Sequence, residues 1–203
     1  MTDDLAKRLV MTPQLQMAIR MLQTPASELG AFVDELRATA PDSFVELPVG
    51  EPDPYDELER AAAIDEEREP YFLLDDSPLP AVATGTPDVW VFGNPPQARA
   101  NGRAFPRFQV VDGNRDARWL VRAFRQRAKT YERVVSAMLA LRPAIAIAMQ
   151  PEQIEPVKIR DVAEAVGMHE STIDRVARAC RFQTIHGLVA FAVTRGRLGF
   201  RGV

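Results

Sequence analysis

The sequence predicts an all-α fold: two short N-terminal helices, an acidic disordered linker, and a long helix followed by a helix-turn-helix. Three observations carry this prediction. Apolar residues recur at helical spacing in residues 13–36 and 116–141. Most of the 16 prolines lie between Pro41 and Pro106, where they interrupt regular structure. Residues 159–178 have the spacing of two helices joined by a tight turn.

The first helix is predicted to begin at Thr12-Pro13, where a hydroxyl N-cap precedes a proline at the first helical position. Thr24-Pro25 repeats this signal for the second helix, with Ser27 as a competing cap. Each helix has one apolar face, formed by Leu15, Ala18, Ile19 and Leu22 in the first and by Leu29, Phe32, Val33 and Leu36 in the second. Because one face each is too little for a core, both helices must dock on the rest of the chain or on a partner.

Residues 42–86 are acidic and proline-rich, which predicts a linker or disorder, with a weak helix at 54–69. Residues 1–88 contain 19 acidic and 6 basic side chains, a net charge of −13, whereas residues 89–203 contain 9 and 19, a net charge of +10. This asymmetry suggests that only the second half meets a polyanion, although solvated faces that differ by chance would give the same numbers. The predicted domains are 1–40, 41–86 and 87–203.

Residues 116–141 are the longest predicted element. Side chains that step by four and three residues form a seam, as in a helix that packs against another: Leu120, Phe124, Arg127, Tyr131, Val134, Met138 and Leu141. A second stripe on another face is basic and consists of Arg118, Arg122, Arg125, Lys129 and Arg133. This stripe is either a solvated face or a surface for DNA phosphates.

Residues 159–178 predict the helix-turn-helix itself. Val162 and Val166 lie one turn apart on the first helix, with Ala163 between them where two helices must approach closely. Gly167 follows where the turn needs a residue that adopts a positive φ. Ile173 and Val176 are expected to pack the second helix back onto the first. Since the second helix of such a motif enters the major groove with its N-terminal residues, the sequence predicts a DNA reader.

The second helix is expected to begin near Glu170 or Ser171. Its predicted DNA-facing side chains are His169, Glu170, Ser171, Thr172, Arg175 and Arg178. Arg175 is the best candidate for a guanine or phosphate contact, whereas Asp174 is awkward beside a polyanion. Ser171 either caps the helix or contacts a base.

Other chemistry is not expected. His169 and His186 are the only histidines and Cys180 is the only cysteine, so the sequence predicts neither a metal site nor an intrachain disulfide, and Cys180 is expected to be a small buried apolar residue. The sequence has no glycine-rich phosphate loop and no serine nucleophile elbow, which argues against a cofactor and against an enzyme. It also has no signal core and no apolar run of membrane-spanning length, so a cytoplasmic protein is expected.

Two further segments have weaker patterns. Val89 to Phe92 has the length of a short strand. Leu188 to Val193 is apolar, and the arginines Arg195, Arg197 and Arg201 then alternate with glycines. This terminal segment is either a tail that touches phosphate or a frayed end.

Both ends of the chain resemble the sigma-54 family of bacterial transcription initiation factors. Residues 12–23 (TPQLQMAIRMLQ) resemble the family's regulatory region I. Residues 117–130 resemble the start of its extra-long helix, and residues 160–173 (RDVAEAVGMHESTI) resemble its helix-turn-helix signature. Residues 86–91 resemble the stretch that leads into its DNA-binding part.

The resemblance implies a function. A member binds promoter DNA and core RNA polymerase, and an AAA+ activator remodels region I using ATP. On this chain the implied partner-binding residues are Leu15, Gln16, Ile19, Leu22, Leu29, Phe32, Val33 and Leu36.

The chain also departs from the family's pattern. Residues 42–85 are too short for the family's core-binding domain, its terminal promoter-reading domain has no counterpart, and Asp174 stands where the family usually has serine. A shortened initiation factor is therefore the first hypothesis. A stand-alone helix-turn-helix regulator or competitor that does not bind polymerase, and a module that sequesters an activator, are the alternatives.

Overall fold

The all-α prediction is wrong, because a six-stranded mixed sheet makes up much of the second half of the chain. The computed structural model describes residues 13–39, 44–46, 85–102, 108–110 and 115–203. The predicted linker therefore lies mostly, and the weak helix at 54–69 entirely, outside the described residues. Within the described part of the chain, no helix is both long and apolar enough to cross a membrane.

The predicted N-terminal helices are present. Helix α1 spans Pro13–Gln23, a 3-10 turn η1 spans Ala26–Glu28, and helix α2 spans Leu29–Thr39. No side chain caps η1, so neither Thr24 nor Ser27 has the capping role that the sequence suggested; the Thr24 hydroxyl instead donates to the carbonyl of Arg20 at 2.9 Å. One face of the pair meets the next long helix in a buried apolar cluster: Met21, Leu29, Phe32, Val33, Leu120, Val121 and Phe124.

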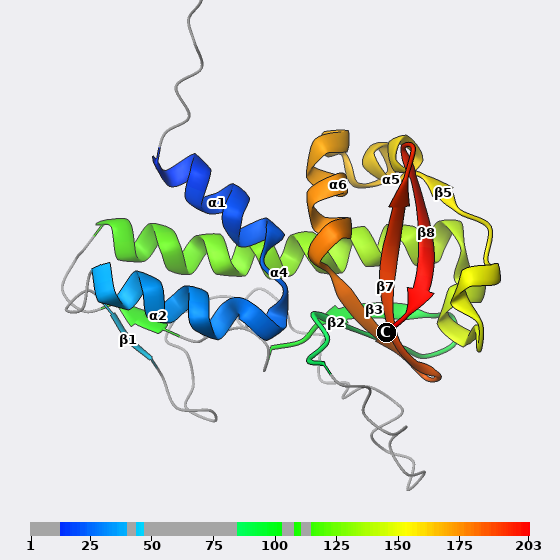
Figure 1. Cartoon of the computed structure of the whole chain (residues 1–203), viewed down its shortest axis with the longest axis horizontal. Helices are drawn as coiled ribbons and strands as arrows, with labels where there is room; N and C mark the ends of the chain where they lie inside the picture. Colours follow the sequence, from blue (N-terminus) through cyan, green and yellow to red (C-terminus); the bar gives the residue numbers. More distant parts are fainter. Residues whose placement is uncertain (1–12, 40–43, 47–84, 103–107, 111–114) are drawn as a thin grey trace, which may run out of the picture.

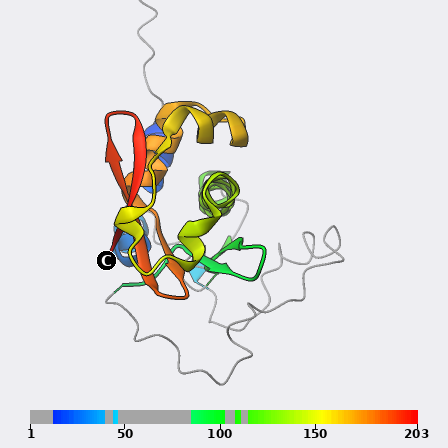
Figure 2. The same cartoon turned by 90° about the vertical axis from the view of Figure 1, so that its right-hand side faces the viewer.

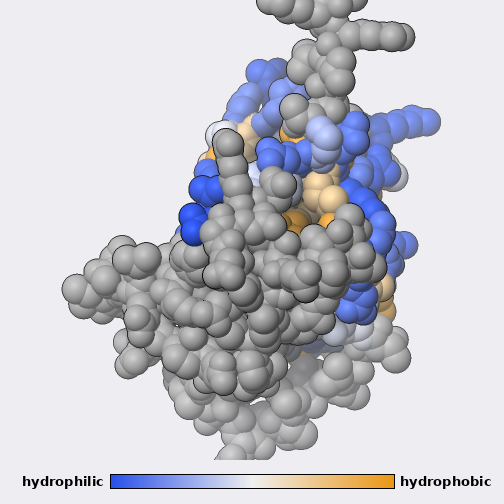
Figure 3. Space-filling model, turned by 90° about the vertical axis from the view of Figure 1, so that its left-hand side faces the viewer, coloured by the Kyte–Doolittle hydropathy of each residue, from blue (hydrophilic) through white to orange (hydrophobic). Residues whose placement is uncertain are grey.

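That long helix, α4, spans Arg115–Leu141 and runs the length of the molecule (Figure 1). Its predicted seam is confirmed, since six of the seven seam side chains are buried and Leu141 is half-buried. Helices α1 and α2 lie along its N-terminal half, and the sheet lies along its C-terminal half (Figure 1). Seen from the end at which α4 begins, the described surface is mainly hydrophilic, with a small hydrophobic group within it (Figure 3).

The six-stranded sheet has the order β3-β2-β6-β7-β8-β5. Its strands are β2 (Val89–Phe92), β3 (Gln97–Ala100), β5 (Val157–Lys158), β6 (Arg181–Thr184), β7 (Gly187–Thr194) and β8 (Arg197–Gly202). Strand β2 runs parallel to β6 and every other pair is antiparallel. A separate two-stranded pair joins β1 (Phe44–Glu46) to β4 (Phe108–Val110). The strand that the sequence indicated at Val89 to Phe92 is confirmed.

The sheet curls around the C-terminal half of α4. The two short helices of the helix-turn-helix lie on the side of α4 that the sheet leaves open (Figure 2). A ladder of aromatic rings crosses three strands: the ring centroids of Phe182 and Phe191 are 5.2 Å apart, and those of Phe191 and Phe200 are 6.1 Å apart. All three rings are buried in the same core as Tyr131 and Met138 of α4. The terminal segment is thus part of the core and is neither a tail nor a frayed end.

A buried polar cluster, which we call the Arg127 latch, joins the two halves of the molecule. It consists of Arg127, Asp88 and Tyr131. The Arg127 guanidinium donates to the Asp88 carboxylate at 2.8 Å, with both side chains fully buried, and it lies 4.0 Å from the centroid of the Tyr131 ring. It also donates to the backbone carbonyls of Met21 and Thr24, at 3.0 and 2.6 Å.

Tyr131 and Asp88, the other two members of the latch, make hydrogen bonds to further segments. The Tyr131 hydroxyl donates to the Leu22 carbonyl at 2.8 Å, and the second Asp88 oxygen accepts the amide of Arg181 at 3.0 Å. Burial raises the pKa of the Asp88 carboxyl, and the charge and hydrogen bonds of Arg127 oppose that rise. The latch therefore ties the end of α1 to the entry of β2 and the entry of β6.

Removing one member of this pair leaves the other charge buried without compensation. We expect Arg127→Met and Asp88→Asn each to lower the free energy of unfolding by about 3–5 kcal/mol, measured by urea denaturation. Arg20→Gln is the matched control, because Arg20 also pairs with a carboxylate, Glu35, but on the exposed surface. Its unfolding midpoint should stay near that of the wild type. A latch variant as stable as this control would contradict the structural role of the pair.

Candidate nucleic-acid interface

The helix-turn-helix is formed as predicted. Helix α5 spans Ile159–Val166 and helix α6 spans Glu170–Ala179. Gly167 has a φ of 64°, so it adopts the left-handed conformation that the turn requires. The amide of Met168 donates to the Ala163 carbonyl at 3.0 Å and that of Gly167 to the Glu164 carbonyl at 3.2 Å. These two bonds form a Schellman motif, which closes α5 and turns the chain into α6.

The predicted contacts between the two helices are also present. Val162, Ala163 and Val166 of α5 are buried in one cluster with Ile173 and Val176 of α6. The cluster also contains Cys180, whose thiol is fully buried, as the sequence indicated; burial raises the pKa of this thiol. The motif is thus held rigidly on the core formed by α4 and the sheet.

The start of α6 is capped by a histidine. His169 precedes the helix in an extended conformation, and its Nδ1 accepts the Ser171 amide at 3.1 Å, with the Ser171 hydroxyl 2.8 Å away. The N-cap of α6 is therefore His169, whereas the sequence had suggested Ser171 for this role. Its imidazole has a structural role in addition to any contact with DNA.

The predicted DNA-facing side chains differ in exposure. His169, Glu170 and Arg178 are exposed, whereas Ser171, Thr172 and Arg175 are half-buried. Helix α1 packs directly against α6. Among the described residues Arg175 has no ion-pair partner, so its guanidinium charge is not neutralised within that part of the protein.

Asp174 and Arg178 neutralise each other. Arg178 donates to both carboxylate oxygens of Asp174, at 2.9 and 3.0 Å, one turn apart on α6. This bidentate pair raises the pKa of Arg178, first through the hydrogen bond and second through the charge of Asp174. Asp174 therefore competes with a phosphate for the arginine that the sequence assigned to DNA.

The basic stripe on α4 is divided. Arg118, Arg122 and Lys129 are exposed and Arg125 is half-buried. Arg133, which the sequence placed in the same stripe, donates to the Val166 carbonyl at 2.6 Å and so helps to close the C-terminus of α5. The stripe begins toward the end of α4 that is distant from the helix-turn-helix (Figure 1), and Arg133, its last member, contacts the motif.

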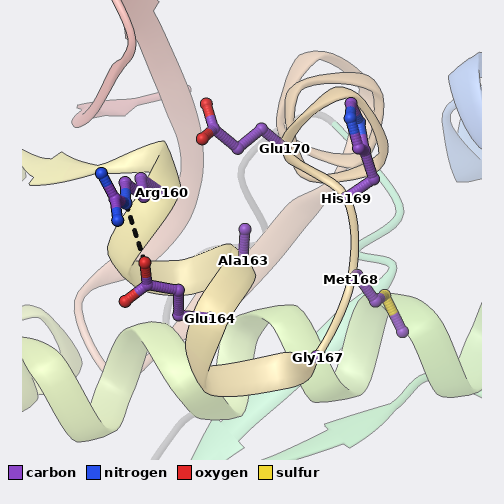
Figure 4. A pocket seen from close by; sticks show the side chains of 7 residues that line it. All are labelled: Arg160, Ala163, Glu164, Gly167, Met168, His169 and Glu170. Carbon is purple, nitrogen blue, oxygen red and sulfur yellow. Dashed lines mark hydrogen bonds and ion pairs between the residues drawn. The ribbon is translucent and has the colours of Figure 1, made fainter.

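A shallow hollow lies between α5 and α6 (Figure 4). It is lined by Arg160, Ala163, Glu164, Gly167, Met168, His169 and Glu170. Arg160 points at Glu164 and pairs with it at 2.8 Å, so neither charge is directed into an enclosed site. No group of three histidine, cysteine, aspartate or glutamate side chains in the described ranges is arranged to hold a metal ion.

The residues that the family resemblance implied for partner binding do not form one surface. Leu15 and Gln16 are exposed, whereas Ile19, Leu22 and Leu36 are half-buried. Leu29, Phe32 and Val33 are buried against α4. The sequence analysis gave Asp88 no structural role, naming it only within residues 86–91, and it placed Arg127 in the packing seam and at the start of the long helix without a partner. An arginine at a core position of that seam was the available signal, since a buried guanidinium needs a partner.

The histidine cap gives a direct test of how α6 begins. His169→Ala removes the acceptor for the Ser171 amide, so we expect a loss of about 0.5–2 kcal/mol in the free energy of unfolding, measured by thermal or urea denaturation. His169→Asn supplies a different capping acceptor and should restore most of that loss. Equal stability of the alanine and asparagine variants would show that the cap contributes nothing.

Two family models match the chain. Residues 109–193 match "Sigma-54, DNA binding domain", which covers all of α4, the helix-turn-helix, β6 and β7 up to Val193. Residues 4–37 match "Sigma-54 factor, Activator interacting domain (AID)", which covers α1 and most of α2. The two matches fall on the two halves that the Arg127 latch joins.

Individual relatives agree with the models. The chain is 40% identical to the RNA polymerase sigma-54 factor of Caulobacter vibrioides over 67 residues, 33% of this chain and 13% of that factor. It is 33% identical to that of Acidithiobacillus ferridurans over 92 residues (45% and 19%) and 32% identical to that of Bacillus subtilis over 71 residues (35% and 16%). The aligned parts therefore span less than a fifth of these relatives. With both domain models matched in the family's order, the chain belongs to the sigma-54 family.

Proposed function

We propose that this chain acts as a sigma-54-like transcription initiation factor. It binds promoter DNA through α6, associates with core RNA polymerase, and responds to an AAA+ activator through its N-terminal helices. The observation that carries the proposal is the contact of α1 with α6. The segment matched to the activator-interacting domain contacts α6, the helix that would read DNA. A partner that moves α1 would therefore change the surroundings of α6.

The proposed division of labour follows the predicted domains. Residues 1–40 receive the activator, residues 41–86 link, and residues 87–203 bind DNA. The exposed Leu15 and Gln16 are the first points of contact for a partner, whereas the buried Leu29, Phe32 and Val33 become accessible only when α2 leaves α4. The chain needs no catalytic residue or cofactor of its own for this function, which it would perform beside the chromosome in the cytoplasm.

The second candidate is a DNA-binding regulator, or a competitor of a complete factor, that does not bind polymerase. It is favoured by the short interval between the two matched segments, residues 38–108, where the family resemblance implies a large core-binding domain. A third candidate is a module that sequesters an activator. It depends only on the N-terminal helices, and deletion of residues 1–39 should abolish activator binding if it is correct.

Three measurements on the purified chain separate these candidates: affinity for a promoter duplex with the upstream GG and downstream GC elements that the family resemblance implies, capture of core polymerase, and transcription in vitro with an activator and ATP. An initiation factor gives all three signals. DNA binding alone supports the regulator or competitor. The absence of both polymerase capture and an activator-dependent transcript would overturn the initiator proposal.

Arg175 provides the sharpest test of α6 as the reading helix. We expect Arg175→Ala to weaken binding to the promoter duplex by about 1–3 kcal/mol, measured by fluorescence anisotropy, because it removes an arginine contact to a base or phosphate. Arg201→Ala, which removes an exposed charge from β8, is the control for net charge. Equal affinities of the two variants would remove Arg175 from the interface.

Replacing Asp174 should raise the affinity for DNA, in contrast to the replacement of Arg175. Asp174→Ser releases Arg178 from its bidentate pair and removes a negative charge from α6. We therefore expect a higher affinity for DNA and a plot of log K against log salt that is steeper by about one phosphate contact, roughly 0.9 in slope. Asp161→Ser removes a carboxylate from α5 and serves as the charge-matched comparison. A decrease in affinity for Asp174→Ser would indicate that Asp174 itself contacts a base.

A further inference from the structure

We propose that the tip of the β7–β8 hairpin is a second DNA-contacting surface, made by Lys158, Arg195 and Arg197, that binds the phosphate backbone of a duplex held by α6. This inference rests on the proposed DNA-binding function and adds a site to it. The match to the DNA-binding domain model ends at Val193, so Arg195 and Arg197 lie beyond the matched segment, whereas Lys158 on the neighbouring strand β5 lies within it. We call these three cations the hairpin-tip cluster.

The turn itself is the first observation. Arg195 and Gly196 are the two residues between the strands, with φ values of 44° and 75°. Two successive positive φ values are the pattern of a type I′ turn, in which asparagine, aspartate or glycine is strongly preferred at the first position. Among the described residues, Arg195 is the only non-glycine residue with a positive φ. Turn formation therefore gives no reason for an arginine at this position.

The second observation is independent of the turn. Strand β5 pairs with β8 so that Lys158 lies directly opposite Arg197, and β7 pairs with β8 so that Arg197 faces Thr194 at the base of the turn. Like charges in directly opposed positions disfavour strand pairing. All three cations are exposed, and none has an ion-pair partner in the part of the chain that the structure describes. The nearby Arg160 is already paired with Glu164.

The tip is held in place. The Ile159 amide at the start of α5 donates to the Gly196 carbonyl at 2.9 Å, which fastens the turn to the helix-turn-helix. The hairpin tip, α5 and the N-terminal end of α6 lie at the same end of the molecule in two perpendicular views (Figures 1 and 2). A polyanion that crosses this end meets both the reading helix and the hairpin-tip cluster.

Duplex DNA is the partner that fits this arrangement. Arginine binds phosphate oxygens with two parallel hydrogen bonds and lysine binds them as a point charge. Phosphate contacts set the orientation of a protein on the duplex and carry no sequence information. The hairpin-tip cluster would therefore fix how α6 enters the groove without reading bases.

Arg195→Asn tests the proposal cleanly, because Asn-Gly is the favoured pair for a type I′ turn. The variant should have a melting temperature equal to or above that of the wild type, so a loss of DNA binding would not reflect misfolding. We expect the slope of log K against log salt to fall by about 0.9, which corresponds to roughly five-fold weaker binding at ~0.15 M salt. Arg195→Asn with Arg197→Gln should lose about twice that slope.

Arg201→Gln is the matched control, since it removes an exposed arginine of the same hairpin whose strand partner, Ala190, lies away from the tip. Its slope should equal that of the wild type. Duplexes shortened stepwise from each end add a geometric readout: the difference between the wild type and Arg195→Asn should vanish when one particular end is removed and persist when the other is removed.

The outcomes separate this inference from the proposed function. An unchanged slope for Arg195→Asn, beside weaker binding by Arg175→Ala, overturns the hairpin contact and leaves the DNA-binding function intact. Equal losses for Arg195→Asn and Arg201→Gln also overturn it, because only net charge would then matter. A wild-type chain that binds no duplex at low salt overturns both.

Discussion

The buried ion pair between Arg127 and Asp88 is the interaction on which the rest of the structure depends. Two charges without solvent exposure are costly unless every polar group around them is used. Here the pair connects three segments that are distant in the sequence: the end of α1, the entry of β2 and the entry of β6. Its geometry fixes where α1 lies, and α1 in turn covers part of α6.

This arrangement connects the N-terminal helices to the rest of the core. Helix α4 contributes to two buried apolar clusters. It forms one with the N-terminal helices and the other with the sheet and the helix-turn-helix. The Arg127 latch lies where they meet, and its hydrogen bonds to α1 end on backbone carbonyls of Met21 and Leu22. Backbone acceptors hold the helix without a requirement for particular side chains there. In the proposed function, an activator that withdraws the N-terminal segment would have to break these bonds, and the withdrawal would uncover the side of α6 that α1 contacts.

Much of the helical part could be predicted from the sequence, because its signals are local. The start of α1 at Pro13, the seam of α4 and the positive φ of Gly167 are each specified by nearby residues, and all of these appear in the structure. The sheet could not be predicted in the same way. Strand β7 is a continuous apolar run without alternation, its partner β6 has only four residues, and its partner β8 is interrupted by arginine and glycine. The pairing of β6 with β2 (Val89–Phe92) brings Asp88 to Arg181 and Arg127, and local patterns do not relate these residues.

Hydrogen exchange of the α1 amides in an Arg127→Lys variant tests the central claim most directly. Lysine keeps the positive charge opposite Asp88 but lacks the planar fork that reaches the Asp88 carboxylate and two carbonyls together. We expect faster exchange across residues 13–23 of the variant, with exchange in β7 and β8 close to that of the wild type. Unchanged protection of α1, or an equal loss throughout the molecule, would contradict the claim that this arginine holds the N-terminal helix on the DNA-binding half.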